Sequence, residues 1–294
     1  MPNVTISTDA RPRLVTTAIE LRDAVAAARA DGKTIGLAPT MGALHGGHLS
    51  LVRASLAQCD YTIVTIFVNP TQFGPHEDLG EYPRTLETDL DALSQCGVDL
   101  VFAPTNDGIY PKGFSTYVDP PRVAEALEGQ CRRGHFRGVT TVVLKLFNLA
   151  QADVAFFGQK DYQQSLVIRW MVQDLDFPIE VRVCPTVREP DGLAMSSRNR
   201  YLSQPEREQA LTLWRSLKLA VELFAQGESD AERITARMRE LFEQTNINRV
   251  DYVALADPET LQPVHQIQAS TVALVAAYVG DTRLIDNCRI GNDE

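Results

Sequence analysis

Apolar residues recur along this chain in two alternating patterns. Short apolar runs predict strands, and apolar residues repeated every three or four positions predict helices. The strands expected in the first two thirds of the chain are 34–37, 61–68, 99–103, 154–157 and 181–184. The helices expected among them are 16–30, 49–56, 86–95 and 139–150. This alternation predicts an α/β fold with a buried parallel sheet.

The pattern changes after a polar loop at 185–199. Two amphipathic helices are expected there, at 205–225 and 230–244. Strand candidates follow at 250–256, 271–279 and 283–288. Asp281-Thr282 between the last two fits a tight hairpin. We therefore predict an N-terminal domain at 1–187 and a smaller α+β C-terminal domain at 188–294.

Composition narrows the class of partner. The chain has 294 residues, 44% of them hydrophobic, and a formal net charge of −10, which opposes nonspecific binding to nucleic acid or anionic membranes. We expect small-molecule partners, no nucleic acid and no membrane. No apolar run approaches the roughly 18 residues of a membrane span, and a signal-peptide core is absent, so a cytoplasmic location is expected. Five scattered cysteines without a Cys-x-x-Cys pair indicate neither a disulfide framework nor structural zinc.

The segment Ala38–His48 joins the first strand to the following helix and reads Ala-Pro-Thr-Met-Gly-Ala-Leu-His-Gly-Gly-His. A helix start presents unpaired backbone N–H groups and partial positive charge, and glycines let a phosphate approach. His45 and His48 share one face of the first helical turn. A lone histidine would be interpreted as an ordinary side chain, but this context favours a phosphate site. Two imidazoles without a P-loop lysine favour chemistry at the α-phosphate and formation of an adenylate.

Polar side chains also follow two other predicted strands. Asn69 and Gln72 carry carboxamides that suit a substrate with hydroxyl and carboxylate groups. Lys160 is suited to phosphate, and Gln164 lies one helical turn later. Ligands of open α/β sheets bind at the carboxyl ends of strands, so these loops predict one site. Each loop also has a purely structural interpretation. Asn69 could belong to an ordinary Asn-Pro turn, and Asp161 could lie in the first turn of a capped helix.

Three further segments carry charge. Arg132–Arg137 is the densest basic patch, interpreted as a solvated loop that could close over an anion. Met195–Asn199 offers two hydroxyls and a guanidinium in a segment expected to be flexible, which fits a phosphate clamp. Asp89 is a candidate magnesium ligand because ATP chemistry normally requires a metal. Glu87 is interpreted as an ordinary acidic residue of a first helical turn.

Six motifs occur together in one order along the chain. They are Pro39–His48, Phe67–Phe73, Tyr82–Thr85, Gly134–Val139, Gly158–Asp161 and Met195–Asn199. In this combination the chain strongly resembles the pantothenate synthetase (pantoate–β-alanine ligase) family of the nucleotidylyltransferase superfamily. The resemblance runs nearly end to end, through Leu284–Asn287.

The resemblance implies an ATP-dependent ligase that joins (R)-pantoate to β-alanine. The pantoate carboxylate would attack the α-phosphate of ATP and expel pyrophosphate, and β-alanine would then displace AMP from a pantoyl adenylate. Mg²⁺, a cytoplasmic location and a homodimer are implied as well. The implied fold is a Rossmann-like N-terminal domain with a smaller C-terminal domain that closes over the site.

The resemblance also implies residue roles. The implied ATP-binding residues are Met41, Gly42, Ala43, Leu44, His45, Gly46, Gly47, His48, Gly158, Gln159, Lys160, Asp161, Val187, Met195, Ser196, Ser197 and Arg198. Among these, His48 would be the proton donor, His45 its partner at the phosphates, and Lys160 and Arg198 would supply charge. Gln72 and Gln164 would bind pantoate, with Asn69 close by, and Asp89 matches a magnesium-associated carboxylate.

The sequence differs from the family pattern at one visible position, and two other functions are alternatives. Arg133 stands where the family usually has proline, which leaves the order of that loop open. Another nucleotidyl-transferring enzyme could use the same turn, and a noncatalytic nucleotide-binding module could share the fold. An aminoacyl-tRNA synthetase is disfavoured by the net charge and by the lack of an added anticodon-binding region.

Overall fold

The computed structural model describes residues 11–75, 77–247 and 249–291, which form two compact units. The first unit comprises the chain up to Ala124, Arg132–Gly158 and Val167–Cys184. The second comprises Glu125–Cys131, Gln159–Leu166 and the chain from Pro185 onward. The last junction falls near the predicted boundary at 187. Two short earlier segments nevertheless belong to the second unit. The prediction of a single boundary placed both of them in the N-terminal domain.

The first unit is built on a six-stranded sheet. Its strands are β1 (Arg13–Val15), β2 (Ile35–Thr40), β3 (Tyr61–Ile66), β4 (Leu100–Phe102), β5 (Val154–Gly158) and β6 (Glu180–Cys184). Every pairing in it is parallel, and the strand order is β1-β4-β3-β2-β5-β6. The predicted parallel Rossmann-like sheet is therefore confirmed.

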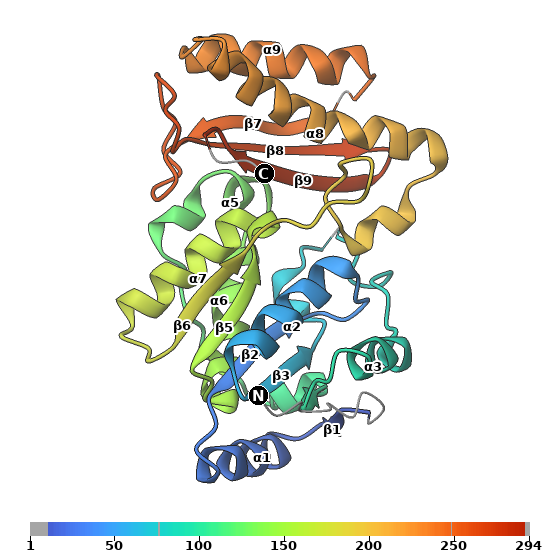
Figure 1. Cartoon of the computed structure of the whole chain (residues 1–294), viewed down its shortest axis with the longest axis vertical. Helices are drawn as coiled ribbons and strands as arrows, with labels where there is room; N and C mark the ends of the chain where they lie inside the picture. Colours follow the sequence, from blue (N-terminus) through green and yellow to red (C-terminus); the bar gives the residue numbers. More distant parts are fainter. Residues whose placement is uncertain (1–10, 76, 248, 292–294) are drawn as a thin grey trace, which may run out of the picture. The chain divides into compact units, whose positions relative to one another are not determined.

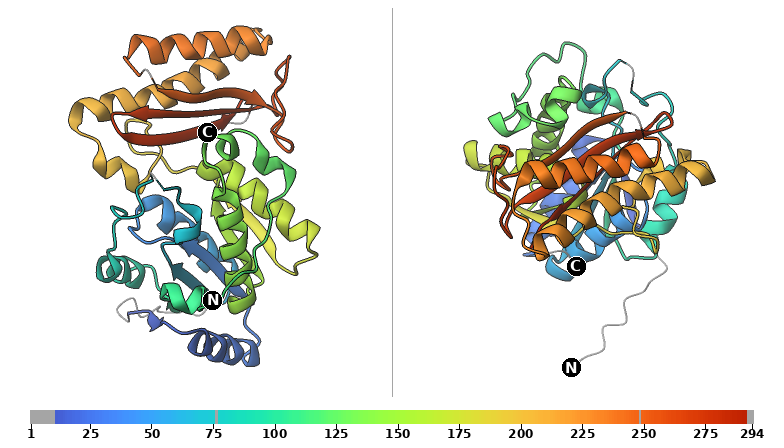
Figure 2. Two further views of the ribbon diagram at one scale, coloured as in Figure 1. Left: turned by 180° about the vertical axis from the view of Figure 1, so that it is seen from behind. Right: turned by 90° about the horizontal axis from the view of Figure 1, so that it is seen from above.

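Helices cover both faces of this sheet. The helices of the first unit are α1 (Ala18–Ala30), α2 (Gly46–Gln58), α3 (Leu86–Ser94), α4 (Asn106–Ile109), α6 (His135–Ala150) and most of α7 (Tyr162–Asp174), with short 3₁₀ turns η1 (Pro70–Gln72) and η2 (Arg122–Glu125). Successive residues of β2 belong to different apolar cores, one on each face of the sheet. Leu37 packs with α1 and α6, whereas Ala38 packs with α2 and α3. Figures 1 and 2 show α2 and α6 on opposite faces.

The strand order places a topological switch point between β2 and β5. From β2 the chain proceeds to β3 and β4 on one side, and β5 and β6 extend the sheet on the other. Ligands of doubly wound sheets bind outside the carboxyl ends of the strands at such a point. The turn after β2 starts at Met41, and Gly158 ends β5. The fold thus puts two predicted ATP-binding segments directly after the two strands that flank the switch point.

The second unit contains an antiparallel sheet. Its elements are α5 (Glu128–Cys131), η3 (Gln159–Asp161), η4 (Ser197–Tyr201), α8 (Gln204–Ala225), α9 (Ala231–Gln244), β7 (Val250–Ala256), β8 (Val272–Val279) and β9 (Thr282–Arg289). The sheet order is β7-β8-β9, and α8 and α9 pack on it through an apolar core (Figure 1). The predicted α+β character is confirmed. The tight β8–β9 turn consists of Gly280 and Asp281, because Val279 pairs with Thr282.

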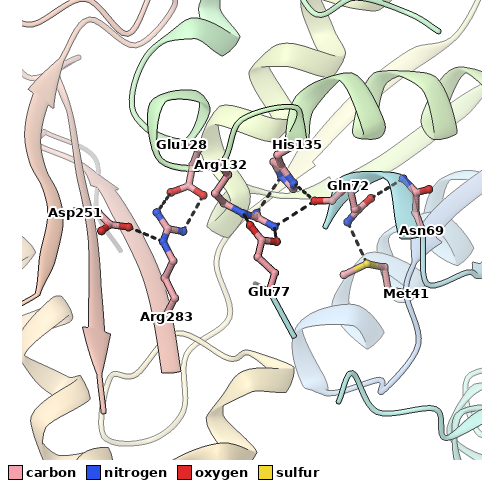
Figure 3. Close-up of polar contacts among 9 residues, drawn as sticks. All are labelled: Met41, Asn69, Gln72, Glu77, Glu128, Arg132, His135, Asp251 and Arg283. Carbon is pink, nitrogen blue, oxygen red and sulfur yellow. Dashed lines mark hydrogen bonds and ion pairs between the residues drawn. The ribbon is translucent and has the colours of Figure 1, made fainter. Parts of the chain in front are cut away.

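A largely buried ion network fixes α5 to the sheet of the second unit (Figure 3). Arg283 of β9 donates to both carboxylate oxygens of Glu128 at 2.6 and 2.9 Å and to Asp251 at 2.7 Å. The Tyr252 hydroxyl donates to Glu128 at 2.7 Å. Burial, with the Glu128 charge beside it, raises the pKa of Tyr252 well above its ordinary value, so this hydroxyl stays protonated as a donor.

The apolar pattern misses one strand and places the start of two helices too late. It does not predict β1, because three residues are too few to show a period. α2 begins at Gly46 rather than 49, and α6 at His135 rather than 139, since their first turns are polar or glycine-rich. No helix in the described ranges is long and apolar enough to cross a membrane.

Candidate active site

The turn after β2 has a backbone shape that few residues adopt. Gly42 and Ala43 both have positive φ, 81° and 49°, and the second value is uncommon for a residue with a side chain. Thr40 supports the turn: its hydroxyl donates to the Thr65 carbonyl at 2.7 Å and accepts from the Gly42 N–H at 3.2 Å. The turn delivers the chain to the start of α2, where His45 is the N-cap residue.

The two histidines of this turn lie against each other and cap the helix. Their ring centroids are 4.1 Å apart. His45 Nδ1 accepts from the Gly47 N–H at 3.2 Å, and His48 Nδ1 accepts from the His45 N–H at 3.4 Å. In a neutral imidazole whose Nδ1 accepts, the proton is on Nε2. Both rings therefore present an Nε2–H donor, and the predicted pairing of these histidines at the helix start agrees with the geometry.

The backbone N–H groups of the turn bind within the protein. Those of Ala43 and Leu44 donate to Asp89, while those of Gly42, His45 and Gly47 donate to the side chains described above. The sequence predicted instead a cradle of unpaired N–H groups. In the structure these groups maintain the shape of the turn, which makes the imidazoles the better candidates for binding phosphate.

Asp89 does not fit a magnesium site. Its side chain is buried, with the residue only 2% exposed. Oδ1 accepts from the Leu44 N–H at 2.8 Å, and Oδ2 accepts from the Ala43 N–H at 3.0 Å and the Thr85 hydroxyl at 3.2 Å. Within the described ranges, no group of three or more acidic, cysteine or histidine side chains could hold a metal ion. We therefore assign no metal to this carboxylate.

A cavity of about 370 Å³ adjoins this turn at the carboxyl ends of β2, β3 and β4. Its wall includes Met41, Gly42, Phe67, Arg84, Asp89 and Asn106. Among the described residues that line this cavity, Asp89 is the single acidic one, and Arg84 contributes a positive charge. The charge of the cavity lining therefore gives a divalent cation little attraction.

Two of the predicted pantoate residues, Asn69 and Gln72, lie in one hydrogen-bonded group (Figure 3). Gln72, in η1, accepts at Oε1 from Asn69 Nδ2 at 3.1 Å, and its Nε2 donates to the sulfur of Met41 at 3.1 Å. Asn69 is 1% exposed, and its second amide hydrogen is donated to the Gly138 carbonyl. Both amide hydrogens of Asn69 are thus engaged, which gives this residue a clear structural role. Substrate binding by Asn69 stays a prediction.

The start of α6 holds the main chain of Gln72 (Figure 3). Arg132 Nη1 lies 3.1 Å from His135 Nε2, and because arginine can only donate, that nitrogen accepts. His135 Nδ1–H then donates to the Gln72 carbonyl at 2.8 Å. Glu77 holds Arg132 through two hydrogen bonds of 2.6 and 2.8 Å. The basic loop expected to close over an anion is, at Arg132, anchored inside the first unit.

This anchor predicts a loss of stability in acid. Burial alone would raise the pKa of Glu77, but hydrogen bonds and charge from Arg132 hold it below the ordinary value. The stabilisation is therefore present near neutral pH and is lost as pH falls through the lowered pKa. Urea unfolding should show Glu77→Gln less stable by about 1 to 3 kcal/mol at neutral pH, with the difference from wild type shrinking in acid. A difference that persists unchanged in acid would contradict this assignment.

In the second unit, β9 holds the turn that contains Lys160. Asn287 Nδ2 donates to the carbonyls of Gln159 and Lys160 at 3.0 and 2.8 Å. The Lys160 ammonium lies 3.7 Å from Asp161. The sequence patterns do not single out Asn287 as a site residue, although a polar Asp-Asn pair in an apolar strand is an available signal. Its two carbonyl contacts fix the backbone from which Lys160 projects.

The polar loop predicted at 185–199 contains a hydrogen-bonded hairpin at 187–195. The Met195 N–H donates to the Val187 carbonyl at 3.0 Å, which brings two predicted ATP-binding residues together. Arg188 is held by both oxygens of Asp286, at 2.7 and 3.1 Å, and stacks on Trp214 at 3.6 Å. Asp286 therefore fixes the predicted ATP-binding segment that begins at Val187, and the adjacent Asn287 fixes the one that contains Lys160.

The segment predicted as a phosphate clamp, Met195–Asn199, leads from that hairpin into η4. Ser196 caps η4 by accepting the Arg198 N–H at 3.3 Å, and Ser197 is buried. Asn199 donates to Glu189 and to the Ala194 carbonyl at 2.8 and 3.1 Å. The hydroxyls and guanidinium that were predicted as a set thus come from one ordered turn.

Two consecutive glutamines at the start of α7 differ in their surroundings. Gln163 is buried, accepts from the Glu128 N–H at 3.0 Å and donates to the Ala126 carbonyl at 2.8 Å. Gln164 is half-buried, and its face of the helix differs from that of its neighbour. Substrate binding by Gln164 stays a prediction.

A doubly wound parallel sheet with a histidine-capped turn at its switch point defines an α/β protein with a candidate ligand site of the kind that binds nucleotides. The model of the family Pantoate-beta-alanine ligase matches residues 13–289. The chain belongs to this family. The resemblance inferred from the six motifs is confirmed.

Relatives with this family name match the chain over nearly its full length. The pantothenate synthetase of Moorella thermoacetica is 53% identical over 274 residues, which cover 93% of this chain and 97% of the relative. A crystal structure of pantothenate synthetase from Thermus thermophilus is 45% identical, with a TM-score of 0.91 over 95% of this chain and all of that one. A pantoate-β-alanine ligase from Francisella tularensis, complexed with β,γ-ATP and β-alanine, is 32% identical, with a TM-score of 0.79 over 96% and 99% of the two chains.

Proposed function

We propose that this chain condenses (R)-pantoate with β-alanine in an ATP-dependent reaction, giving pantothenate, AMP and pyrophosphate through a pantoyl adenylate. Family membership supports this reaction, and the complex of the Francisella relative supports ATP and β-alanine as ligands. The observation that carries the proposal is the contact of 3.1 Å between Gln72 Nε2 and Met41 Sδ. It joins the turn proposed for pantoate to the turn proposed for ATP within one unit.

In the first step, a pantoate carboxylate oxygen attacks the α-phosphorus of ATP, and the bond to the β-phosphate oxygen breaks. Negative charge develops on the phosphates as pyrophosphate leaves. The Nε2–H groups of His45 and His48 donate to these oxygens, which is stabilisation by preorganised donors. Gln72 binds pantoate through its carboxamide, whose orientation is fixed by Asn69 and Met41.

In the second step, the neutral amine of β-alanine attacks the carbonyl carbon of the pantoyl adenylate. The carbon–oxygen bond to AMP breaks and the amine nitrogen loses one proton to solvent, so AMP leaves with an oxygen that came from pantoate. Adenylation has converted a carboxylate oxygen, a poor leaving group, into a good one, and exclusion of water protects the mixed anhydride.

The second unit contributes charge in this proposal. Lys160 and Arg198 contact the ATP phosphates, and Gly158–Asp161, Val187 and Met195–Ser197 complete the nucleotide-binding set. Gln164 assists Gln72 with pantoate. Mg²⁺ enters with ATP as part of the substrate. We also propose a cytoplasmic homodimer, and light scattering of the purified protein would test the dimer.

Product analysis tests the reaction. With ATP, Mg²⁺, pantoate and β-alanine, the protein should form pantothenate, AMP and pyrophosphate in equal amounts. Omission of β-alanine should stop turnover after the adenylate forms. Pyrophosphate release that does not depend on pantoate would favour another nucleotidyl-transferring enzyme, and ATP binding without any AMP formation would favour a noncatalytic module.

Replacement of Lys160 by alanine is expected to raise the KM for ATP about tenfold, because a charge-assisted hydrogen bond to phosphate is lost. Lys218→Ala removes the same charge from an exposed position of α8 and serves as the control. Steady-state kinetics with ATP and pantoate varied separately would measure both variants. Unchanged kinetics for both substrates in Lys160→Ala would remove this lysine from the site.

A further inference from the structure

Asp89 has an unusual set of partners for a carboxylate in an ATP-dependent enzyme. Its two oxygens accept three hydrogen bonds, and two of these come from consecutive main-chain N–H groups, those of Ala43 and Leu44. These residues lie 46 and 45 positions away in the sequence. A carboxylate on α3 thereby binds the turn between β2 and α2.

The bound turn includes a strained backbone conformation. Ala43 has a φ of 49°, a left-handed conformation that costs roughly 1 to 2 kcal/mol for a residue with a Cβ. A Cβ at Gly42 would lie 3.1 Å from Asp89 Oδ2, so the turn also packs directly against the carboxylate. Hydrogen bonds to an ionised acceptor are stronger than those between neutral groups. Asp89 is therefore able to offset the strain at Ala43.

The same contacts leave the carboxylate poorly suited to a cation. A magnesium ion requires oxygen ligands at about 2.0–2.1 Å in near-octahedral geometry. Oδ2 already accepts two hydrogen bonds and Oδ1 one, and the side chain is buried. Arg84 lines the cavity that Asp89 borders.

We propose that Asp89 is a positioning residue that holds the ATP-binding turn in its left-handed conformation, and that it does not bind magnesium. The turn leads directly to His45 and His48, whose rings are placed by the start of α2. Asp89 thus acts on ATP through the histidines. This inference rests on the proposed function, because it assumes that the turn binds ATP.

The test separates positioning from metal binding by measuring ATP affinity with and without the metal. Titration calorimetry of the full chain with ATP would be performed once in excess EDTA and once with saturating Mg²⁺. For Asp89→Asn we expect affinity about tenfold weaker than wild type under both conditions, since the loss does not involve the metal. A metal ligand would weaken ATP binding only when Mg²⁺ is present.

Glu87→Gln is the matched control. It makes the same carboxylate-to-amide change in the first turn of α3, on a side chain that is 76% exposed, and should leave both affinities unchanged. Pantoate affinity, measured in the same preparations, should change less than ATP affinity in Asp89→Asn. A general loss of folding would lower both equally.

Thr85→Val provides a milder variant in case Asp89→Asn does not fold. It retains the carboxylate but removes the hydroxyl that donates to Oδ2. We expect a smaller loss of ATP affinity that is again equal with and without Mg²⁺. A loss confined to the Mg²⁺ condition, or no loss in either variant, would overturn the inference. Formation of pantothenate by the wild-type protein would show that the proposed function is unaffected by that result.

Discussion

His48→Ala is expected to lower pantoate-dependent formation of the adenylate roughly a hundredfold or more, the effect typical of losing a preorganised donor. The change removes the Nε2–H that we assign to the phosphates. It also removes Nδ1, which accepts the His45 N–H at the start of α2. Loss of such a cap costs about 1 kcal/mol, so the variant should stay folded. Rapid-quench measurement of adenylate formation, together with thermal unfolding, would record both effects.

His48→Asn separates the two functions of this ring. The asparagine oxygen is able to accept the His45 N–H, but the side chain is too short to place a donor where Nε2–H lies. Its unfolding should therefore resemble wild type while its activity stays as low as that of the alanine variant. His265→Ala, at an exposed histidine of the second unit, controls for removal of an imidazole. Near-normal turnover by His48→Ala would reject the assigned role.

Gly138→Ala is expected to have the second largest effect, on pantoate use. A Cβ at this position would lie 2.3 Å from the Thr71 carbonyl oxygen and 2.7 Å from the Gln72 nitrogen, both of which are backbone atoms that cannot rotate away. The η1 turn must then move from α6, which also disturbs the hydrogen bond between Asn69 and the Gly138 carbonyl. We expect about 1 to 3 kcal/mol of destabilisation and a rise in the KM for pantoate of about tenfold or more.

The pattern of this effect is specific. ATP affinity should change much less, because the turn at Met41–His48 and α2 are not in the path of the added methyl group. Gly80→Ala is the control, since a Cβ there meets nothing within 4 Å. Steady-state kinetics and urea unfolding would compare the two variants. Normal pantoate kinetics in Gly138→Ala would contradict the view that the close approach of α6 fixes Gln72.

Local patterns were sufficient to predict most of the fold. The strand-to-helix alternation predicted the parallel sheet, and the strand candidates at 271–279 and 283–288 correctly indicated a tight hairpin, although its turn is Gly280-Asp281 and not Asp281-Thr282. β1 has no period to detect in three residues and depends on its pairing with β4. The segments Glu125–Cys131 and Gln159–Leu166 join the second unit through contacts such as that between Glu128 and Arg283, 155 positions apart. Such pairings are set by tertiary structure and leave no local signal.

The site was predictable where one short segment contains the chemistry. The pairing of His45 and His48 follows from their spacing at a helix start. The contacts of Asp89 with the turn, and of Glu77 with Arg132, join residues that are 46 and 55 positions apart, and no local pattern indicates them. The metal requirement of ATP chemistry and the family resemblance suggested a metal ligand at Asp89, and the run of basic residues suggested an anion clamp at Arg132. The structure instead uses both charges to hold backbone and side chains in place.

In the proposed reaction, an oxygen of the pantoate carboxylate attacks the α-phosphorus of ATP. Pantoate labelled with ¹⁸O in its carboxylate tests this step in a complete reaction with ATP and β-alanine, followed by mass spectrometry of the products. We expect one ¹⁸O atom in the phosphoryl group of AMP and none in pyrophosphate. Unlabelled AMP, or label in pyrophosphate, would contradict it.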